Sequence, residues 1–363
     1  VFMRLSLVYF FFAVFLAAGL TECCTVGETP SDNQKQKYSS SPNFDAQKGV
    51  FVNLPDPELD AIQEQRRKKN GKARGDASPP DHRLPDVKPD FKSFVSDNSD
   101  FKCIWFGHSS LLLKLDDVLI LVDPVFGRSS PVPFYGGPRF QEPPVTREEL
   151  PDIDFIVISH DHYDHLEKAT VEFFAERNTV FIVPLGISSH LLYWGLKKEN
   201  IIERDWWGTV RLSGIEFTAA PARHSSGRTD RRTNYTQWSS WVIRSGKHSL
   251  YYSGDSGYGK HFREIGKRFG PFDVVFLECG QYYPAWSSHL LPEEWPVVIR
   301  ELKGKKWFPV HWGVFSFAPH EWDDPIISAY SSARKHNIQL LTPKIGEIVD
   351  LNRSRKFEQW WVD

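Results

Sequence analysis

The chain has 363 residues, enough for two average domains or for one large α/β sandwich. Hydrophobic residues make up 40% of it and charged residues 25%, the balance of a soluble globular protein. The formal net charge of −2 argues against a general nucleic-acid-binding protein, which normally carries a large basic excess.

The N-terminal segment, residues 1–24, has the character of an export signal. Arg4 precedes an apolar run from Leu7 to Ala18, which small residues follow. One positive charge before a short apolar core predicts a signal peptide or signal anchor. The run is shorter than the about 20 residues that a membrane-spanning helix needs. Cys23 after the run raises lipidation as an alternative, although the acidic residue before it fits a lipoprotein cleavage site poorly. We expect an exported or membrane-associated protein, with a cytoplasmic location as the alternative.

Residues 25–100 are polar, with clusters of Ser, Pro, Lys and Asp and few apolar patterns. We interpret them as a lead-in or linker. Their basic run, Arg66 to Lys69, could contact anionic lipid head groups, because cations are attracted to such a surface. The solvated face of a short helix or linker is the favoured interpretation of the same run.

From Phe101 on, short apolar segments alternate with turns, and we place the main domain at residues 101–352 with a C-terminal tail at 353–363. Helices are predicted near residues 166–177 and 293–302. Many strands come first in hairpins, whereas helices intervene later, which favours two sheets with helices outside them. The predicted strands span residues 102–106, 110–115, 118–122, 155–159, 180–183, 201–204, 210–212, 215–219, 241–244, 249–252, 274–277 and 307–310.

The segment Ser159-His160-Asp161-His162-Tyr163-Asp164-His165 directly follows one of these apolar strands. Neutral imidazole nitrogens are preferred ligands of Zn²⁺, and a carboxylate suits a second, more oxygen-rich site. His160 and His162 can converge on one ion, while Asp164 and His165 face a neighbouring ion. A chance polar loop is the alternative, but this pattern after a strand is specific for a metal site.

Two such sites need further ligands, and three side chains stand at the ends of later predicted strands. His224 follows the strand at 215–219, Asp255 the strand at 249–252, and His311 the strand at 307–310. Each one alone is more often a turn residue or a hydrogen-bonded histidine. Together they complete a set of seven ligands with Asp255 as the bridge: His160, His162 and His224 on one ion, and Asp164, His165 and His311 on the other.

This order of motifs resembles the metallo-β-lactamase superfamily, and within it the N-acylphosphatidylethanolamine-hydrolysing phospholipase D family and its bacterial relatives. The resemblance covers nearly all of residues 101–325. The ligand motif is common to the superfamily, whereas Asp205-Trp206-Trp207 and the stretch from Lys267 to Asp273 are typical of the narrower family. The resemblance implies an α/β fold of the αββα sandwich type, with two mixed β-sheets flanked by helices and the metals at one edge.

The resemblance also implies a reaction. Two Zn²⁺ or similar divalent ions lower the pKa of a shared water, and the metal-bridging hydroxide would attack the phosphorus of a lipid phosphodiester. Asp255 would hold both ions and orient the nucleophile, so we assign catalytic roles to Asp164 and Asp255. Asp123, at a strand end, is expected to support the ligand loop by hydrogen bonding. His108 is a second candidate for this role, with a buried, satisfied histidine as the alternative.

Residues that contact the substrate are predicted less directly. His289 matches a family histidine near the substrate channel. Arg228, with Arg231 and Arg232, follows His224 closely and could receive a phosphate, with a solvated loop as the alternative. The segment from Ser225 to Arg228 departs from the mammalian pattern and looks like the bacterial relatives.

The sequence thus predicts a dinuclear zinc hydrolase of the phospholipase D type that cleaves N-acylphosphatidylethanolamine-like lipids. The expected partners are a phospholipid or other small-molecule substrate and a membrane surface, not nucleic acid; a homodimer stays open. The high content of aromatic residues, 13 Trp, 27 Phe and 12 Tyr, favours a membrane lipid. Two alternatives remain. They are a metal-dependent lactonase or hydrolase of a small phosphorylated substrate, and a non-catalytic exported zinc-binding protein.

Overall fold

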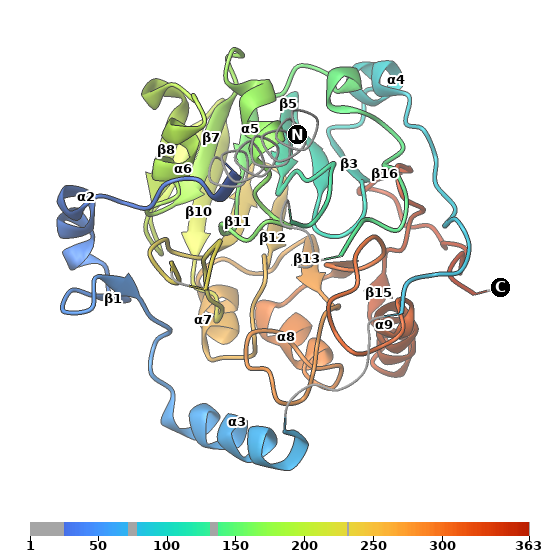
Figure 1. Cartoon of the computed structure of the whole chain (residues 1–363). Coiled ribbons are helices and arrows are strands. Elements are labelled where there is room, and N and C mark those ends of the chain that lie inside the picture. Colours follow the sequence, from blue (N-terminus) through green and yellow to red (C-terminus); the bar gives the residue numbers. More distant parts are fainter. Residues whose placement is uncertain (1–24, 72–77, 131–136, 231, 363) are drawn as a thin grey trace, which may run out of the picture.

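The computed structural model describes residues 25–71, 78–130, 137–230 and 232–362. Within these residues the chain forms two seven-stranded sheets that pack face to face, with helices on both outer surfaces (Figure 1). The predicted αββα sandwich of two mixed sheets is therefore confirmed. The expected export signal, residues 1–24, lies outside the described residues. In the part of the chain that the structure describes, no helix is both long and apolar enough to cross a membrane.

One sheet has the strand order β16-β3-β4-β5-β6-β7-β8. Its first pairs are antiparallel, and the pairs from β5 to β8 are parallel. Leu111 and Leu113 of β4 belong to the core between the sheets, whereas Leu112 belongs to the core under the outer helices. Because both faces are covered, the strands from β5 to β7 are apolar throughout. The strands are β3 (Phe101–Trp105), β4 (Leu111–Leu115), β5 (Val118–Val122), β6 (Phe155–Val157), β7 (Val180–Pro184), β8 (Ile201–Arg204) and β16 (Ile348–Asp350).

The second sheet repeats this plan with the order β15-β14-β13-β12-β11-β10-β9. The pairs from β9 to β12 are antiparallel and those from β12 to β15 are parallel. Each half of the chain thus contributes a hairpin region followed by crossover connections that carry helices. The strands are β9 (Thr209–Leu212), β10 (Ile215–Ala220), β11 (Ser240–Arg244), β12 (Ser249–Tyr252), β13 (Val274–Glu278), β14 (Lys306–Val310) and β15 (Gln339–Leu340).

Helices cover both outer faces of the sandwich (Figure 1). Phe94, Phe174 and Leu191 come from the helices over the first sheet and pack against its outer side chains. Ile265 and Leu302 come from helices over the second sheet and join the core there. The helices are α4 (Phe91–Ser96), α5 (Lys168–Phe174) and α6 (Ser188–Tyr193) on one side and α7 (His261–Arg268), α8 (Trp295–Leu302) and α9 (Asp324–Lys335) on the other. Three short 3-10 helices are η1 (Tyr38–Ser40), η2 (Arg147–Glu149) and η3 (Lys198–Asn200).

The lead-in contains more structure than its polar composition indicated. Besides α4 it forms α2 (Asp32–Lys37), the small sheet of β1 (Phe44–Asp45) and β2 (Val50–Phe51), and the projecting helix α3 (Pro57–Asn70). Tyr38 and Phe51 pack in one cluster with Trp206 and Trp238 of the sandwich. In the basic run on α3, Arg66 donates to Glu294 at 3.0 Å. The aromatic cluster and the Arg66 contact therefore both hold the lead-in against the main domain.

The C-terminal tail also joins the core. Trp360 and Trp361 are buried, although they lie in the segment predicted as a tail. The ring of Trp360 stacks on Trp312 at a centroid distance of 5.3 Å, and Trp312 stacks on Trp105 at 5.1 Å. The tail therefore covers the strand end that carries His311, the residue before Trp312.

Candidate metal centre

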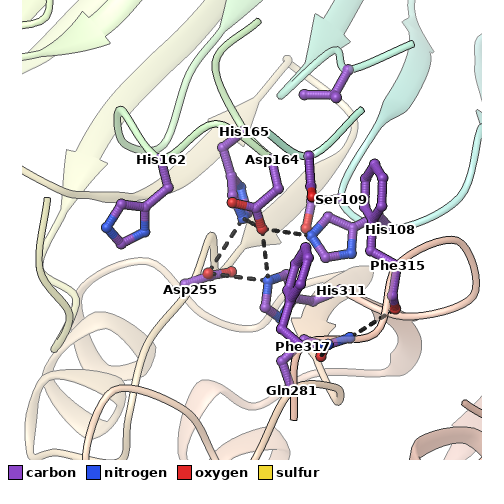
Figure 2. Close-up of polar contacts among 12 residues, drawn as sticks. His108, Ser109, His162, Asp164, His165, Asp255, Gln281, His311, Phe315 and Phe317 are labelled. Carbon is purple, nitrogen blue, oxygen red and sulfur yellow. Dashed lines mark hydrogen bonds and ion pairs between the residues drawn. The ribbon is translucent and has the colours of Figure 1, made fainter. Parts of the chain in front are cut away.

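The predicted donor residues lie just beyond the carboxyl ends of four strands. The loop from His160 to His165 follows β6, and His224 follows β10. Asp255 follows β12, and His311 follows β14 directly. The structure brings all seven predicted ligands together at this edge. Figure 2 labels five of them, His162, Asp164, His165, Asp255 and His311.

One group of donors is rich in nitrogen. It consists of His160, His162, His224 and Asp255, whose ligand atoms lie within 4.8 Å of one another. His160 Nε2 lies 2.9 Å and His224 Nε2 3.2 Å from His162 Nδ1. Nitrogen ligands about 2.0–2.1 Å from a tetrahedral zinc ion are about 3.3 Å apart, so this spacing suits a single ion.

The second group contains Asp164, His165 and His311. Asp255 lies between the two groups, with Oδ2 3.3 Å from His165 Nε2 and 3.1 Å from His311 Nε2. The same oxygen lies 3.8 Å from His160 Nε2 and 3.6 Å from His224 Nε2. Asp255 thus faces imidazoles of both groups, which is the position that a bridging carboxylate requires.

In four of the five ligand histidines, Nδ1 has a hydrogen-bond partner outside the donor groups, which leaves Nε2 facing the centre. Partners of this kind fix the orientation and tautomer of a metal-binding ring. The Nδ1 partners are Ser159 Oγ for His160 at 2.9 Å, Asp123 Oδ2 for His165 at 2.7 Å, the Ser288 carbonyl for His224 at 3.0 Å and the Gly280 carbonyl for His311 at 3.4 Å.

Asp123, predicted to support the ligand loop, is fully buried at the end of β5. Its Oδ1 accepts a hydrogen bond from the Ser159 backbone N–H at 2.7 Å. Its Oδ2 accepts from the Tyr252 hydroxyl at 2.6 Å, in addition to the contact with His165. The carboxylate therefore connects β5, the ligand loop and β12, which carries Asp255 at its end.

Three buried polar atoms in this cluster, His165 Nε2, His311 Nε2 and Asp255 Oδ1, have no hydrogen-bond partner among the described residues. A buried polar atom left without a partner costs about 1–3 kcal/mol. All three belong to the donor groups, so cations bound between these side chains would satisfy them. The residues therefore fit divalent metal ions.

Charge is distributed unevenly between the two groups. Burial lowers the pKa of His160 and His224 well below the ordinary imidazole value, and it also lowers the pKa of His162. These rings are neutral at pH 7, the form that binds metal ions. Burial opposes protonation of His311 too, but Asp255 and Asp164 outweigh it and raise the pKa of His311 to about 10. A cation in the second group therefore has to displace a proton.

Comparison with known proteins identifies the fold family. Residues 119–312, just over half of the chain, match the beta-lactamase superfamily domain. The chain belongs to the metallo-β-lactamase superfamily. It is 36% identical to an uncharacterised Mycobacterium tuberculosis protein over 88% of this chain and 87% of that protein. Its identity to N-acyl-phosphatidylethanolamine-hydrolyzing phospholipase D 1 of Caenorhabditis elegans is 32%, over 60% of this chain and 65% of that protein. A solved metallo hydrolase from Ignicoccus hospitalis gives a TM-score of 0.54 at 22% identity, over 69% of this chain and 97% of that chain.

Membership in the metallo-β-lactamase superfamily makes the chain a metallohydrolase, with divalent metal binding implied by the fold. His108, predicted beside the ligands, donates through Nε2 to the ionised carboxylate of Asp164 at 2.8 Å (Figure 2). Its φ of 51° places it in the left-handed region, where its backbone N–H donates to the Trp312 carbonyl at 2.8 Å. His108 thus lies against the second donor group.

The two residues predicted for the substrate have different surroundings. His289 lies at the rim of the metal centre, with its ring centroid 5.2 Å from those of His224 and His311. Arg228 is instead buried beneath the ligand loop, and it donates to the carbonyls of Asp161 and Leu166 at 2.8 and 2.9 Å. The prediction that Arg228 receives a phosphate is therefore corrected: its guanidinium supports the loop that holds the ligands.

The structure describes one of the other two arginines of that segment. Arg232 is exposed and lies 3.8 Å from Glu28. Arg231 lies outside the described residues.

Three polar residues near the centre were not predicted. Asp161 is buried within the ligand loop and accepts from Gly227 N at 2.6 Å. Asn53 of the lead-in hydrogen-bonds the backbone of His224. Glu278, fully buried, ends β13 beside His311. Glu278 carries the same signal as the ligands, a carboxylate at the end of an apolar strand, and could have been found by it.

Proposed function

We propose that this metallohydrolase is a dinuclear zinc phosphodiesterase of the phospholipase D type that cleaves N-acylphosphatidylethanolamine-like lipids. The observation that carries the proposal is the pair of donor groups on either side of Asp255. Their five imidazoles favour zinc among the common divalent ions. The phospholipid is supported by the similarity to the Caenorhabditis elegans enzyme.

A pair of bound divalent cations supplies a water of lowered pKa and neutralises charge on phosphoryl oxygens. The residues of the chain hold and orient the reactants around these ions. Asp255 faces both donor groups and orients the attacking water between them. Burial would raise the pKa of Asp255, but His165 and His311 hold it well below its usual range, so the carboxylate stays ionised. Asp164 stays ionised for the same reason, with His165 and His108 as its partners.

An aromatic wall beside the second donor group supports a lipid substrate. The rings of Phe315 and Phe317 meet His108 edge-on, at centroid distances of 5.1 and 5.9 Å (Figure 2). Gln281 fixes this wall, because it donates to the Phe315 carbonyl at 3.0 Å and accepts from Phe317 N at 2.6 Å. Phe315 is buried, whereas Phe317 is partly exposed. Phe317 is therefore the ring that an acyl chain could contact beside the polar centre.

The test is hydrolysis by the full, zinc-loaded chain on vesicles that contain N-acylphosphatidylethanolamine. We expect an N-acylethanolamine and phosphatidic acid in equal amounts, identified by mass spectrometry. A parallel panel of lactones and small phosphate esters represents the alternative hydrolases. Turnover of lactones with no cleavage of the phospholipid would overturn the proposal, and zinc binding without any turnover would favour the non-catalytic alternative.

A further inference from the structure

Glu278 is a fully buried carboxylate at the end of an otherwise apolar strand. In the parallel pairing of β13 with β14 it lies opposite Val310, the residue before His311. This register places a carboxylate behind the second donor group. Burying a charge is costly unless it is paired and hydrogen-bonded, so its partners indicate what it does.

Both oxygens of Glu278 form hydrogen bonds with the segment that follows the Cys279–Ser288 connection. Oε2 lies 2.7 Å from His289 Nδ1, and Oε1 accepts from the Leu290 backbone N–H at 2.6 Å. His311 Nδ1 is farther away, at 3.6 Å from Oε2. The shortest side-chain contact of the buried carboxylate is therefore with His289, not with the ligand.

His289 lies where the two donor groups meet. Its ring is stacked on His311 with an interplanar angle of 15° and meets His224 edge-on at 67°. His311 and His224 belong to different donor groups, so a substrate oxygen that spans the two groups passes beside His289. Because Nδ1 faces Glu278, Nε2 is the ring nitrogen left for such a contact. The side chain keeps 12% of its surface exposed, so part of the ring is accessible.

We propose that Glu278 is a positioning residue that holds the His289 ring so that Nε2 hydrogen-bonds the substrate between the two donor groups. This inference rests on the proposed phosphodiester substrate. Asp255, Glu278, His289 and His311 would also satisfy the spacing of a metal site. The contacts favour positioning, because both oxygens of Glu278 already have hydrogen-bond partners at 2.6–2.7 Å.

A double-mutant cycle tests the inference. Glu278→Gln keeps the shape of the side chain but offers a single acceptor oxygen, and we expect kcat/KM to fall by about 10- to 100-fold with zinc content unchanged. In a His289→Ala background the same substitution should cause no further loss, because Glu278 acts through His289. The inference would be overturned if the loss of kcat/KM in the double variant equalled the product of the two single losses. It would also be overturned if Glu278→Gln lost a zinc ion.

A matched control is Glu203→Gln. Glu203 is another glutamate at a strand end that accepts from backbone N–H groups, those of Gly186 and Ser188 at 2.7 and 3.1 Å. It contacts none of the metal ligands among the described residues, so kcat/KM should be unchanged. A loss equal to that of Glu278→Gln would show a general effect of removing a carboxylate that accepts backbone hydrogen bonds, and it would also overturn the inference.

A measurement on the wild-type chain separates this inference from the proposed function. In the zinc-loaded protein with ¹⁵N-labelled histidine, the Nδ1 proton of His289 should exchange slowly with solvent and couple to Nδ1, because Glu278 accepts it. Glu278→Gln should weaken this signal. If the phospholipid is not cleaved but the signal is present, the proposed function fails and the positioning survives. An Nδ1 of His289 without a protected proton would overturn the positioning itself.

Discussion

Asn53 pairs with the backbone of His224 through two hydrogen bonds: its Oδ1 accepts from His224 N at 3.1 Å, and its Nδ2 donates to the His224 carbonyl at 2.8 Å. A residue of the lead-in thus fixes the backbone of a ligand in the nitrogen-rich group. The lead-in is therefore part of the support of the metal centre.

Replacing Asn53 with Ala should weaken zinc binding by about 10-fold, the lower range for losing a residue that supports a ligand. The effect arises because His224 loses both backbone contacts and its ring is no longer held over the centre. Competition with a chelator measures it. Asn70→Ala is the control, since Asn70 lies on α3 and its side-chain amide donates to the Arg66 carbonyl of the same helix. Equal zinc affinity in Asn53→Ala and the wild type would contradict the prediction.

Removing single ligands should affect the two ions differently. His162→Ala removes a donor from one group, so the bound zinc should fall from about two ions per chain to about one. Asp255→Asn removes the negative charge of the carboxylate that faces both groups, so both ions should bind less tightly. Hydrolysis should drop by more than about 100-fold in each variant. Elemental analysis after gel filtration gives the metal content, and a normal zinc content in Asp255→Asn would show that the carboxylate is not a bridge.

Zinc binding to the second group should depend on pH. In the metal-free protein the carboxylates of Asp255 and Asp164 outweigh burial and raise the pKa of His311 to about 10, so His311 is protonated at neutral pH. Zinc must displace this proton. Its affinity therefore rises with pH, by about tenfold per unit for each displaced proton, and levels off above the raised pKa.

The nitrogen-rich group provides an internal comparison for this effect. The pKa values of His160, His162 and His224 are lowered by burial, so these rings bind zinc at pH 7 without losing a proton. Calorimetric titrations in buffers of different ionisation enthalpy count the protons released per ion. Equal proton release for the first and the second ion would contradict the assignment.

The C-terminal tail should stabilise the fold. Trp360→Ala removes a buried ring that stacks on Trp312, and we expect the free energy of unfolding to fall by about 3 kcal/mol. Val362→Ala, at an exposed position of the same segment, should change it little. Urea denaturation followed by far-ultraviolet circular dichroism measures both. If the free energy of unfolding of Trp360→Ala equalled that of the wild type, the tail would not contribute to stability as predicted.

Most strands of the sandwich were predictable because short apolar runs mark them, whereas the short strands β15 and β16 were not predicted. The runs at 118–122, 201–204 and 249–252 coincide with β5, β8 and β12. The helix predicted at 166–177 is shorter in the structure, Lys168–Phe174, because ligand-loop residues precede it. Helices α6 and α7 were not predicted, since helices of six and eight residues show few turns of periodicity. Helix α9, with twelve residues, was not predicted either. The packing of the lead-in was not predicted, because only scattered aromatic residues in a polar segment make its contacts with the main domain.

The metal ligands were predictable for a related reason, since each is a polar side chain placed after an apolar strand. A polar residue after an apolar strand does not by itself indicate the direction in which its side chain points. Arg228 lies four residues after His224, yet its guanidinium points beneath the ligand loop. Asn53 and Asp161 act through backbone groups of distant residues, and such pairings depend on the tertiary fold.

The spread of the ligands along the chain has a consequence for synthesis. His160 to His165 emerge from the ribosome early, whereas His311 follows the penultimate strand of the second sheet, and the Trp360 stack forms only after residue 360 has been made. A nascent chain can bind a cation only loosely through the early histidines, because the second group is not yet assembled. Full loading therefore waits until both sheets have been made, and the ions bound are those available where folding is completed.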